Sequence, residues 1–102
     1  PSEVIGCLNY EARQAIGYLD LATKALPART EKKGFFGHNY QRRREELFRH
    51  VDVFNSTDGP HTIAEAVDRV VGIASDLHML FWLARETGTP LDNFASAYEE
   101  DH

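Results

Sequence analysis

The stretch from Thr62 to Thr87 reads TIAEAVDRVVGIASDLHMLFWLARET, and it decides the fold. Apolar side chains recur in it at alternating steps of four and three residues, which is the period of an α-helix. The members of this apolar row are Ile63, Val67, Val70, Ala74, Leu77, Phe81 and Ala84. Thr62 and Glu65 have the spacing of a capping box, and Gly88 is a typical helix end. We therefore predict a long helix over residues 62–87.

The end of this predicted helix is apolar on every side, from Met79 to Ala84. Such a turn has to be covered from more than one direction. Either the last part of the chain folds back over it, or a second subunit covers it. In the second case Leu80, Phe81 and Trp82 would form the interface of a homo-oligomer, with a dimer favoured. Both alternatives stay open at this point.

Three more helices are predicted from apolar spacing and from helix breakers such as Pro27 and Pro90. They cover residues 3–26, 40–54 and 90–100. The two glycines that flank Phe35 and Phe36 predict a loop over residues 30–39. No segment alternates apolar and polar residues as a strand does. We predict a single all-α domain over residues 1–102, built as a small four-helix bundle that is completed by oligomerisation.

Composition excludes several classes of protein. The 102 residues are 42% hydrophobic and 26% charged, as in globular domains and unlike disordered chains. A net charge of −5 argues against simple binding of duplex DNA. The run from Met79 to Ala84 is too short to span a bilayer, so we expect no membrane association. The single cysteine, Cys7, cannot form an internal disulfide, and we expect a cytoplasmic protein.

The charges are distributed unevenly along the chain. Residues 29–49 hold seven lysines and arginines against three glutamates, whereas residues 50–102 hold two arginines against ten acids. The basic segment is either solvated surface or an anion site in which aromatic side chains stack on a ligand. The candidate phosphate-binding residues are Lys32, Lys33, Arg42, Arg43 and Arg44. A nucleotide or a single-stranded nucleic acid would bind to this basic aromatic loop, residues 29–44.

Acidic residues on two predicted helices form a candidate metal site. Asp68 and Asp76 lie on one stripe of the helix over residues 62–87. Antiparallel packing would bring Glu45 and Glu46 of the preceding helix toward them. Carboxylates gathered in this way suit Mg²⁺, which keeps positions for water and for substrate phosphates. The alternative is that all four are ordinary surface charges.

The segment from Ile73 to Tyr98 resembles the last two helices of the all-α nucleoside-triphosphate pyrophosphohydrolases, the MazG-like proteins and phosphoribosyl-ATP pyrophosphatase. The similar features are an acidic turn that ends at Asp76, an apolar helix, Gly88, and a Leu-Asp pair before a closing helix. Glu45-Glu46 resembles part of the family's earlier Glu-Glu-x-x-Glu motif. The resemblance implies a bundle that dimerises and releases pyrophosphate from a nucleotide with the help of Mg²⁺.

Two positions depart from the family pattern. Arg49 stands where the first motif has its last glutamate, and Ile73 stands where a glutamate accompanies Asp76. The resemblance is therefore compatible with an active Mg²⁺-dependent pyrophosphohydrolase or with an inactive relative that binds nucleotides. Two alternatives from other classes are a non-enzymatic helical module for protein interaction or oligomerisation, and a small binder of anionic ligands.

Overall fold

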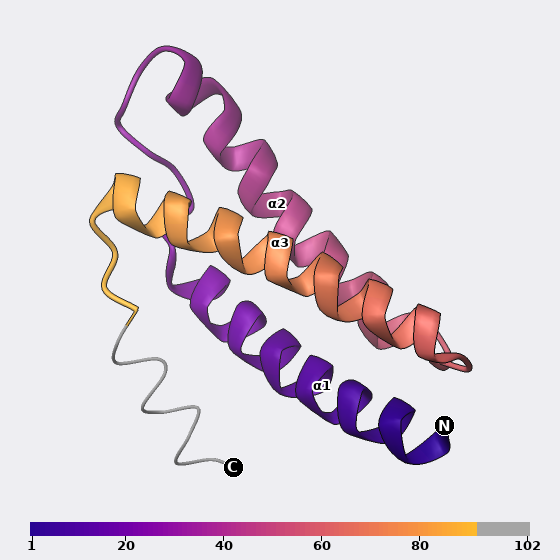
Figure 1. Ribbon diagram of the computed structural model, residues 1–102. Coiled ribbons are helices and arrows are strands. Elements are labelled where there is room, and N and C mark those ends of the chain that lie inside the picture. Colours follow the sequence, from indigo (N-terminus) through magenta and orange to yellow (C-terminus); the bar gives the residue numbers. More distant parts are fainter. Residues whose placement is uncertain (92–102) are drawn as a thin grey trace.

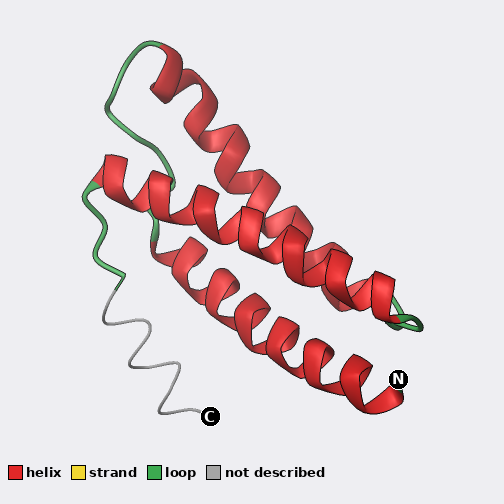
Figure 2. Ribbon diagram, in the orientation of Figure 1, coloured by secondary structure: helices red, strands yellow, loops and turns green. Residues whose placement is uncertain are grey.

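The computed structural model describes residues 1–91, without the side chain of Phe35, and these residues form three helices. The helices are α1 (Ser2–Ala25), α2 (Phe35–Ser56) and α3 (Ile63–Thr87). The chain runs up, down and up, so that α2 is antiparallel to the other two (Figure 1). The described part of the chain contains no strand (Figure 2), which confirms the all-α class. None of its helices is long and apolar enough to cross a membrane.

The predicted fourth helix falls mostly outside the described residues. Pro90 and Leu91, where that helix was expected to begin, are not helical. The rest of the predicted span, to residue 100, lies beyond the part of the chain that the structure describes. The structure therefore shows a three-helix arrangement over residues 1–91.

Both ends of α3 follow from local hydrogen bonding. The Thr62 hydroxyl accepts a hydrogen bond from the Glu65 amide at 3.1 Å, and the Glu65 carboxylate accepts one from the His61 amide at 2.7 Å. The bond from His61 stabilises the charged carboxylate and so lowers the pKa of Glu65. At the other end Gly88 adopts a left-handed conformation with φ of 66°, which an L side chain disfavours.

The predicted loop over residues 30–39 is wrong from Phe35 onward, because α2 already begins there. Packing between helices explains the difference. The Phe36 ring lies one turn before Tyr40 and beside Trp82 of α3, with centroid distances of 5.6 and 5.2 Å. Packing of the Phe36 ring against these two rings outweighs the poor helix propensity of the neighbouring glycines.

The core lies between the three helices and consists of side chains with almost no exposure. Its members are Ala12, Ile16, Leu19, Ala22 and Leu26 from the first part of the chain, Tyr40, Leu47 and Val51 from α2, and Ile73, Leu80, Leu83 and Ala84 from α3. α3 packs more extensively on α1 than on α2. The contact between α2 and α3 is therefore the looser of the two.

The buried side of α3 differs from the apolar row read from the sequence. Ile63, Val67 and Phe81 of that row are exposed to solvent. The buried positions are Ala66, Ile73, Leu80, Leu83 and Ala84. Because α3 carries apolar residues on more than one side, its period cannot decide which side faces α1 and α2. The side of α3 that is buried in the structure leaves part of the predicted apolar row on the surface.

Candidate functional site

Asp76 lies in a groove between α2 and α3, where it is paired with a histidine. Its Oδ1 lies 2.8 Å from Nδ1 of His50. The Asp76 side chain is 15% exposed and that of His50 is 42% exposed. Both residues line a groove of about 470 Å³ whose other walls include Ile16, Val53 and Ile73. When Nδ1 donates its proton to Asp76, Nε2 is the basic nitrogen of the ring.

The other predicted metal ligands have different surroundings. Oε1 of Glu46 lies 3.8 Å from Nε2 of His50, so His50 stands between two carboxylates. Glu45 is exposed and accepts a hydrogen bond from a glutamine one turn earlier. Asp68 is exposed on α3. Within residues 1–91 no three His, Cys, Asp or Glu side chains are close enough to one another to hold a metal ion.

Three of the predicted phosphate-binding residues have partners within the protein. Nζ of Lys32 lies 3.2 Å from the Glu86 carboxylate. Arg42 donates a hydrogen bond to the Asn39 side-chain oxygen at 3.1 Å. The Arg44 guanidinium lies 5.0 Å from the centroid of a phenylalanine ring on the same helix. Of these contacts, only the one between Lys32 and Glu86 pairs a positive charge with a negative one.

Arg43 lines a pocket of about 300 Å³ between the start of α2 and the end of α3. The rings of Phe36, Tyr40 and Trp82 also line it. Burial raises the pKa of Tyr40, whose hydroxyl donates a hydrogen bond to the Pro27 carbonyl at 2.5 Å. Lys33, the remaining predicted phosphate ligand, is exposed in the preceding loop.

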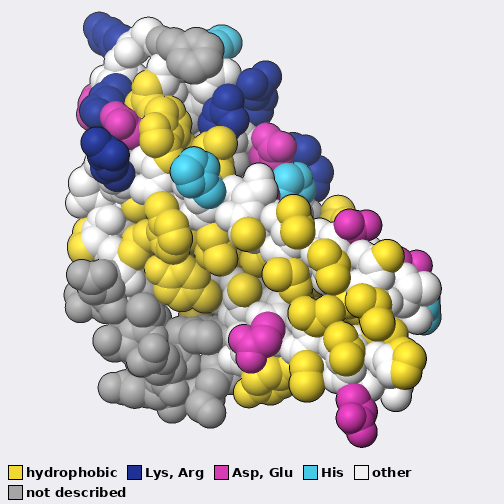
Figure 3. Space-filling view, in the orientation of Figure 1, with side chains coloured by type: hydrophobic (Ala, Val, Ile, Leu, Met, Phe, Trp, Pro, Cys, Tyr) yellow, Lys and Arg dark blue, Asp and Glu magenta, His cyan; other side chains and the backbone are white. Residues whose placement is uncertain are grey.

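An apolar surface, here called the outer face of α3, extends over most of the helix. Its large residues are Ile63, Val67, Val71, Phe81 and Trp82, which are 38–61% exposed. Figure 3 shows hydrophobic side chains in a nearly continuous band on the side where α3 faces the viewer. Two of the three predicted interface residues belong to this face, whereas the third, Leu80, is fully buried inside the protein.

Small residues lie on either side of Val71 near the middle of the outer face, and a groove runs along each side. Gly72, Ala74 and Ser75 are exposed there, and a Cβ placed on Gly72 would meet no atom within 4 Å. A groove of about 230 Å³, lined by Ala12, Ala15, Val70 and Leu77 among others, separates α3 from α1. The groove that contains Asp76 lies on the α2 side. α3 thus forms a ridge between two largely apolar grooves.

His50 is the residue of this region that sequence reasoning misses. It lies on α2, 26 positions before Asp76, so no helical spacing relates the two residues. A histidine amid charged neighbours on an amphipathic helix has no distinguishing pattern of its own. Only the packing of α2 against α3 brings it to the carboxylate.

Comparison of the chain with protein-family models, with curated proteins and with solved structures finds no match.

Proposed function

We propose that this protein is a helical association module that pairs with a second copy of itself through the outer face of α3. The observation that supports this function best is the exposure of Ile63, Val67, Val71, Phe81 and Trp82 on a single helix. A helix that faces bulk water normally presents polar side chains there. A contiguous apolar surface rimmed by charges is instead typical of a protein-binding site.

The shape of the outer face suits a second helix. Ala74 and Ser75 are small residues beside Val71 near the middle of α3, so a second helix can approach the backbone closely next to the Val71 side chain. The grooves on either side of the ridge can receive larger side chains from the opposite helix. An antiparallel pair centred on Ala74 would place Val67 of each copy opposite Phe81 of the other.

The charges of the molecule favour the same antiparallel arrangement. Lys32, Arg43 and Arg85 lie near the C-terminal end of α3, as the contacts of Lys32 with Glu86 and of Arg43 with the Trp82 pocket indicate. The N-terminal end of α3 carries Glu65 and Asp68, with Arg69 next to Asp68 in the sequence. Figure 3 shows most of the visible Lys and Arg side chains toward the end where α2 begins. A twofold pair would set each basic end against the acidic end of its partner.

The size of the outer face limits the strength of the pair. A helix of 25 residues is about 37 Å long, and a contact about 10 Å wide would cover roughly 400 Å² on each copy. This is about half of the area that a standard interface buries on each partner. We therefore expect a weak dimer whose population depends on protein concentration.

Sedimentation velocity across a wide range of protein concentration tests the proposal. The wild-type chain should shift from monomer to dimer, and Val71→Glu should remain monomeric with unchanged helix content by circular dichroism. Leu21→Glu is the matched control, because Leu21 is exposed on α1 and lines neither groove beside α3. A wild-type chain that is monomeric throughout, or a Val71→Glu variant that dimerises normally, contradicts the proposal.

A second candidate is the Mg²⁺-dependent pyrophosphohydrolase, or its nucleotide-binding inactive relative, that the resemblance implies. The position of Asp76 beside His50, in a groove of the size that accepts small ligands, favours it. Activity would appear as Mg²⁺-dependent release of pyrophosphate that is lost in Asp76→Asn. Asp52→Asn, an exposed change elsewhere on α2, should leave that activity unchanged. If the wild-type chain shows no turnover and binds no nucleotide, this candidate is removed.

A further inference from the structure

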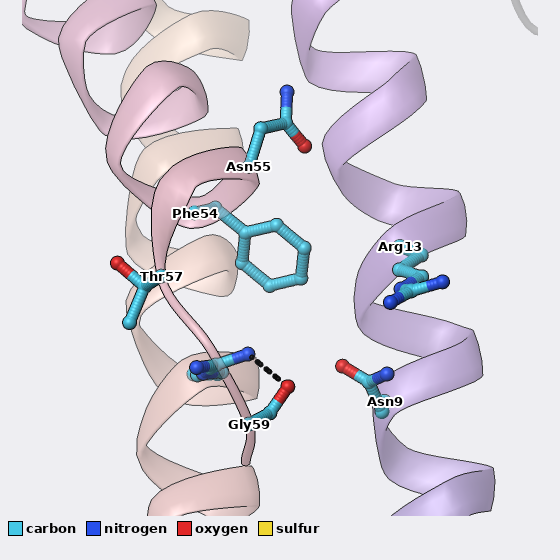
Figure 4. Close-up of a pocket in the computed structure, with 7 residues that line it drawn as sticks. Asn9, Arg13, Phe54, Asn55, Thr57 and Gly59 are labelled. Carbon is cyan, nitrogen blue, oxygen red and sulfur yellow. Dashed lines mark hydrogen bonds between the residues drawn. The ribbon is translucent and has the colours of Figure 1, made fainter.

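A further pocket, with a volume of about 350 Å³, lies between α1 and the connection from α2 to α3. Its lining includes Asn9 and Arg13 of α1, Phe54 and Asn55 of α2, Gly59 of the connection, and Arg69 of α3. Figure 4 shows these residues arranged around the Phe54 ring. None of the large apolar residues of the outer face of α3 lines the pocket, although Phe54, Thr57 and Arg69 also line the groove that contains Asp76.

One wall of this pocket is fixed by Arg69. Its Nη1 donates a hydrogen bond to the Gly59 carbonyl at 3.0 Å, and its Nη2 donates one to the Asp58 carbonyl at 2.5 Å. The same guanidinium lies 5.4 Å from the centroid of the Phe54 ring. These contacts hold the connection against α2 and α3, and they leave a positive charge at the pocket wall.

The α1 side of the pocket carries polar groups that the protein does not satisfy. Oδ1 of Asn9 is shielded from solvent and has no hydrogen-bond partner among the described residues. The side chains of Arg13 on α1 and of Asn55 on α2 are exposed to solvent and make no hydrogen bond or ion pair within residues 1–91. Figure 4 shows Asn9 extending from the edge of α1 toward the space beside the Phe54 ring, with Arg13 over α1 next to it. A shielded acceptor without a donor costs free energy that a ligand would recover.

We propose that this pocket binds a small organic anion that combines a carboxylate, a flat apolar body and a hydrogen-bond donor. The carboxylate pairs with the Arg13 guanidinium, whose planar set of N–H groups matches two carboxylate oxygens. The flat body lies against Phe54, and the donor reaches Oδ1 of Asn9. The charge of Arg69 adds to the attraction, because its hydrogen bonds to carbonyl groups do not neutralise it.

Calorimetric titration of the full chain with four probes tests this proposal. The probes are 3-hydroxybenzoate, benzoate, the neutral 3-hydroxybenzamide and inorganic phosphate. We expect 3-hydroxybenzoate to bind with one site per chain and more tightly than benzoate, because only the former offers a donor to Asn9. The neutral amide should bind at least about tenfold more weakly, since it cannot pair with Arg13 as an anion.

Two variants assign the binding to the pocket. Arg13→Gln should weaken the binding of 3-hydroxybenzoate at least about tenfold. Arg49→Gln, a matched change of an exposed arginine on α2, should leave the binding unchanged. Asn9→Ala should remove the preference for 3-hydroxybenzoate over benzoate. Circular dichroism of each variant establishes that it is folded. Failure of both carboxylates to bind, tighter binding of phosphate, or equal affinity in Arg13→Gln would overturn the proposal.

Discussion

His50 of α2 and Asp76 of α3 are joined by a contact of 2.8 Å between Nδ1 and Oδ1. The contact connects the two helices that pack less extensively on each other than either does on α1. We expect the effects of His50→Gln and Asp76→Asn on the free energy of unfolding to depart from additivity by about 0.5–1 kcal/mol. The term is small because His50 is 42% exposed and solvent screens the pair. Urea unfolding of the two single variants and the double variant measures this term. Strictly additive effects would show that the contact contributes nothing.

The hydrogen bond from Tyr40 to the Pro27 carbonyl predicts a measurable loss in Tyr40→Phe. Removal of the hydroxyl should lower the free energy of unfolding by about 1 kcal/mol, because the ring stays buried while the carbonyl loses its donor. Tyr10→Phe serves as the control, since Tyr10 is 59% exposed and its change should be neutral. If Tyr40→Phe, Tyr10→Phe and the wild type all have the same free energy of unfolding, this account is contradicted.

The same residue predicts a loss of stability at alkaline pH. Burial raises the pKa of Tyr40 above its ordinary value of 10.0, so the folded state favours the neutral phenol. The resulting stabilisation is present below pH 10 and is lost as the pH rises through the raised pKa. Tyr40→Phe should therefore flatten the alkaline part of a plot of unfolding free energy against pH. An unchanged alkaline slope in the variant argues against a buried, titrating phenol.

Glu65 predicts the opposite dependence at acidic pH. The hydrogen bond from the His61 amide lowers the pKa of Glu65 below its ordinary value of 4.5. Stabilisation by the charged carboxylate is therefore present above pH 4.5 and is lost as the pH falls through the lowered pKa. Glu65→Gln should reduce the acid sensitivity of thermal unfolding, whereas Glu3→Gln, an exposed acid on α1, should not. Identical acid profiles for the wild type and Glu65→Gln would refute the role of this carboxylate.

Two glycines inside helices are expected to respond to alanine with opposite signs. A Cβ on Gly37 would overlap the Lys32 carbonyl oxygen, whereas a Cβ on Gly6 would meet no atom within 4 Å. Gly6→Ala should stabilise the protein by about 0.5–1 kcal/mol through helix propensity alone. Gly37→Ala should destabilise it by about 1–2 kcal/mol, because the backbone overlap outweighs that gain. Melting temperatures of the two variants decide the matter, and a stabilised Gly37→Ala would rule out the close approach.

The candidate site residues differ in whether neighbouring positions in the sequence are enough to predict them. Phe81 and Trp82 are visible in the sequence because a turn that is apolar on every side must expose some of its residues or bury them against a partner. The pairing of His50 with Asp76 carries no such signal, since it joins two helices. The acidic stripe that includes Asp68 is consistent with a solvated helix surface as well as with a metal site. In the structure Asp68 is exposed.

Helical period, capping residues and helix breakers are local properties, and they were sufficient to predict an all-α chain and a long helix over residues 62–87. Packing between helices decided the rest. It extended α2 back to Phe35 by placing the Phe36 ring against Trp82, and it selected which apolar side of α3 is buried. A helix with more than one apolar side has several nearly equivalent ways to pack, and their free energies differ only through contacts with residues distant in the sequence.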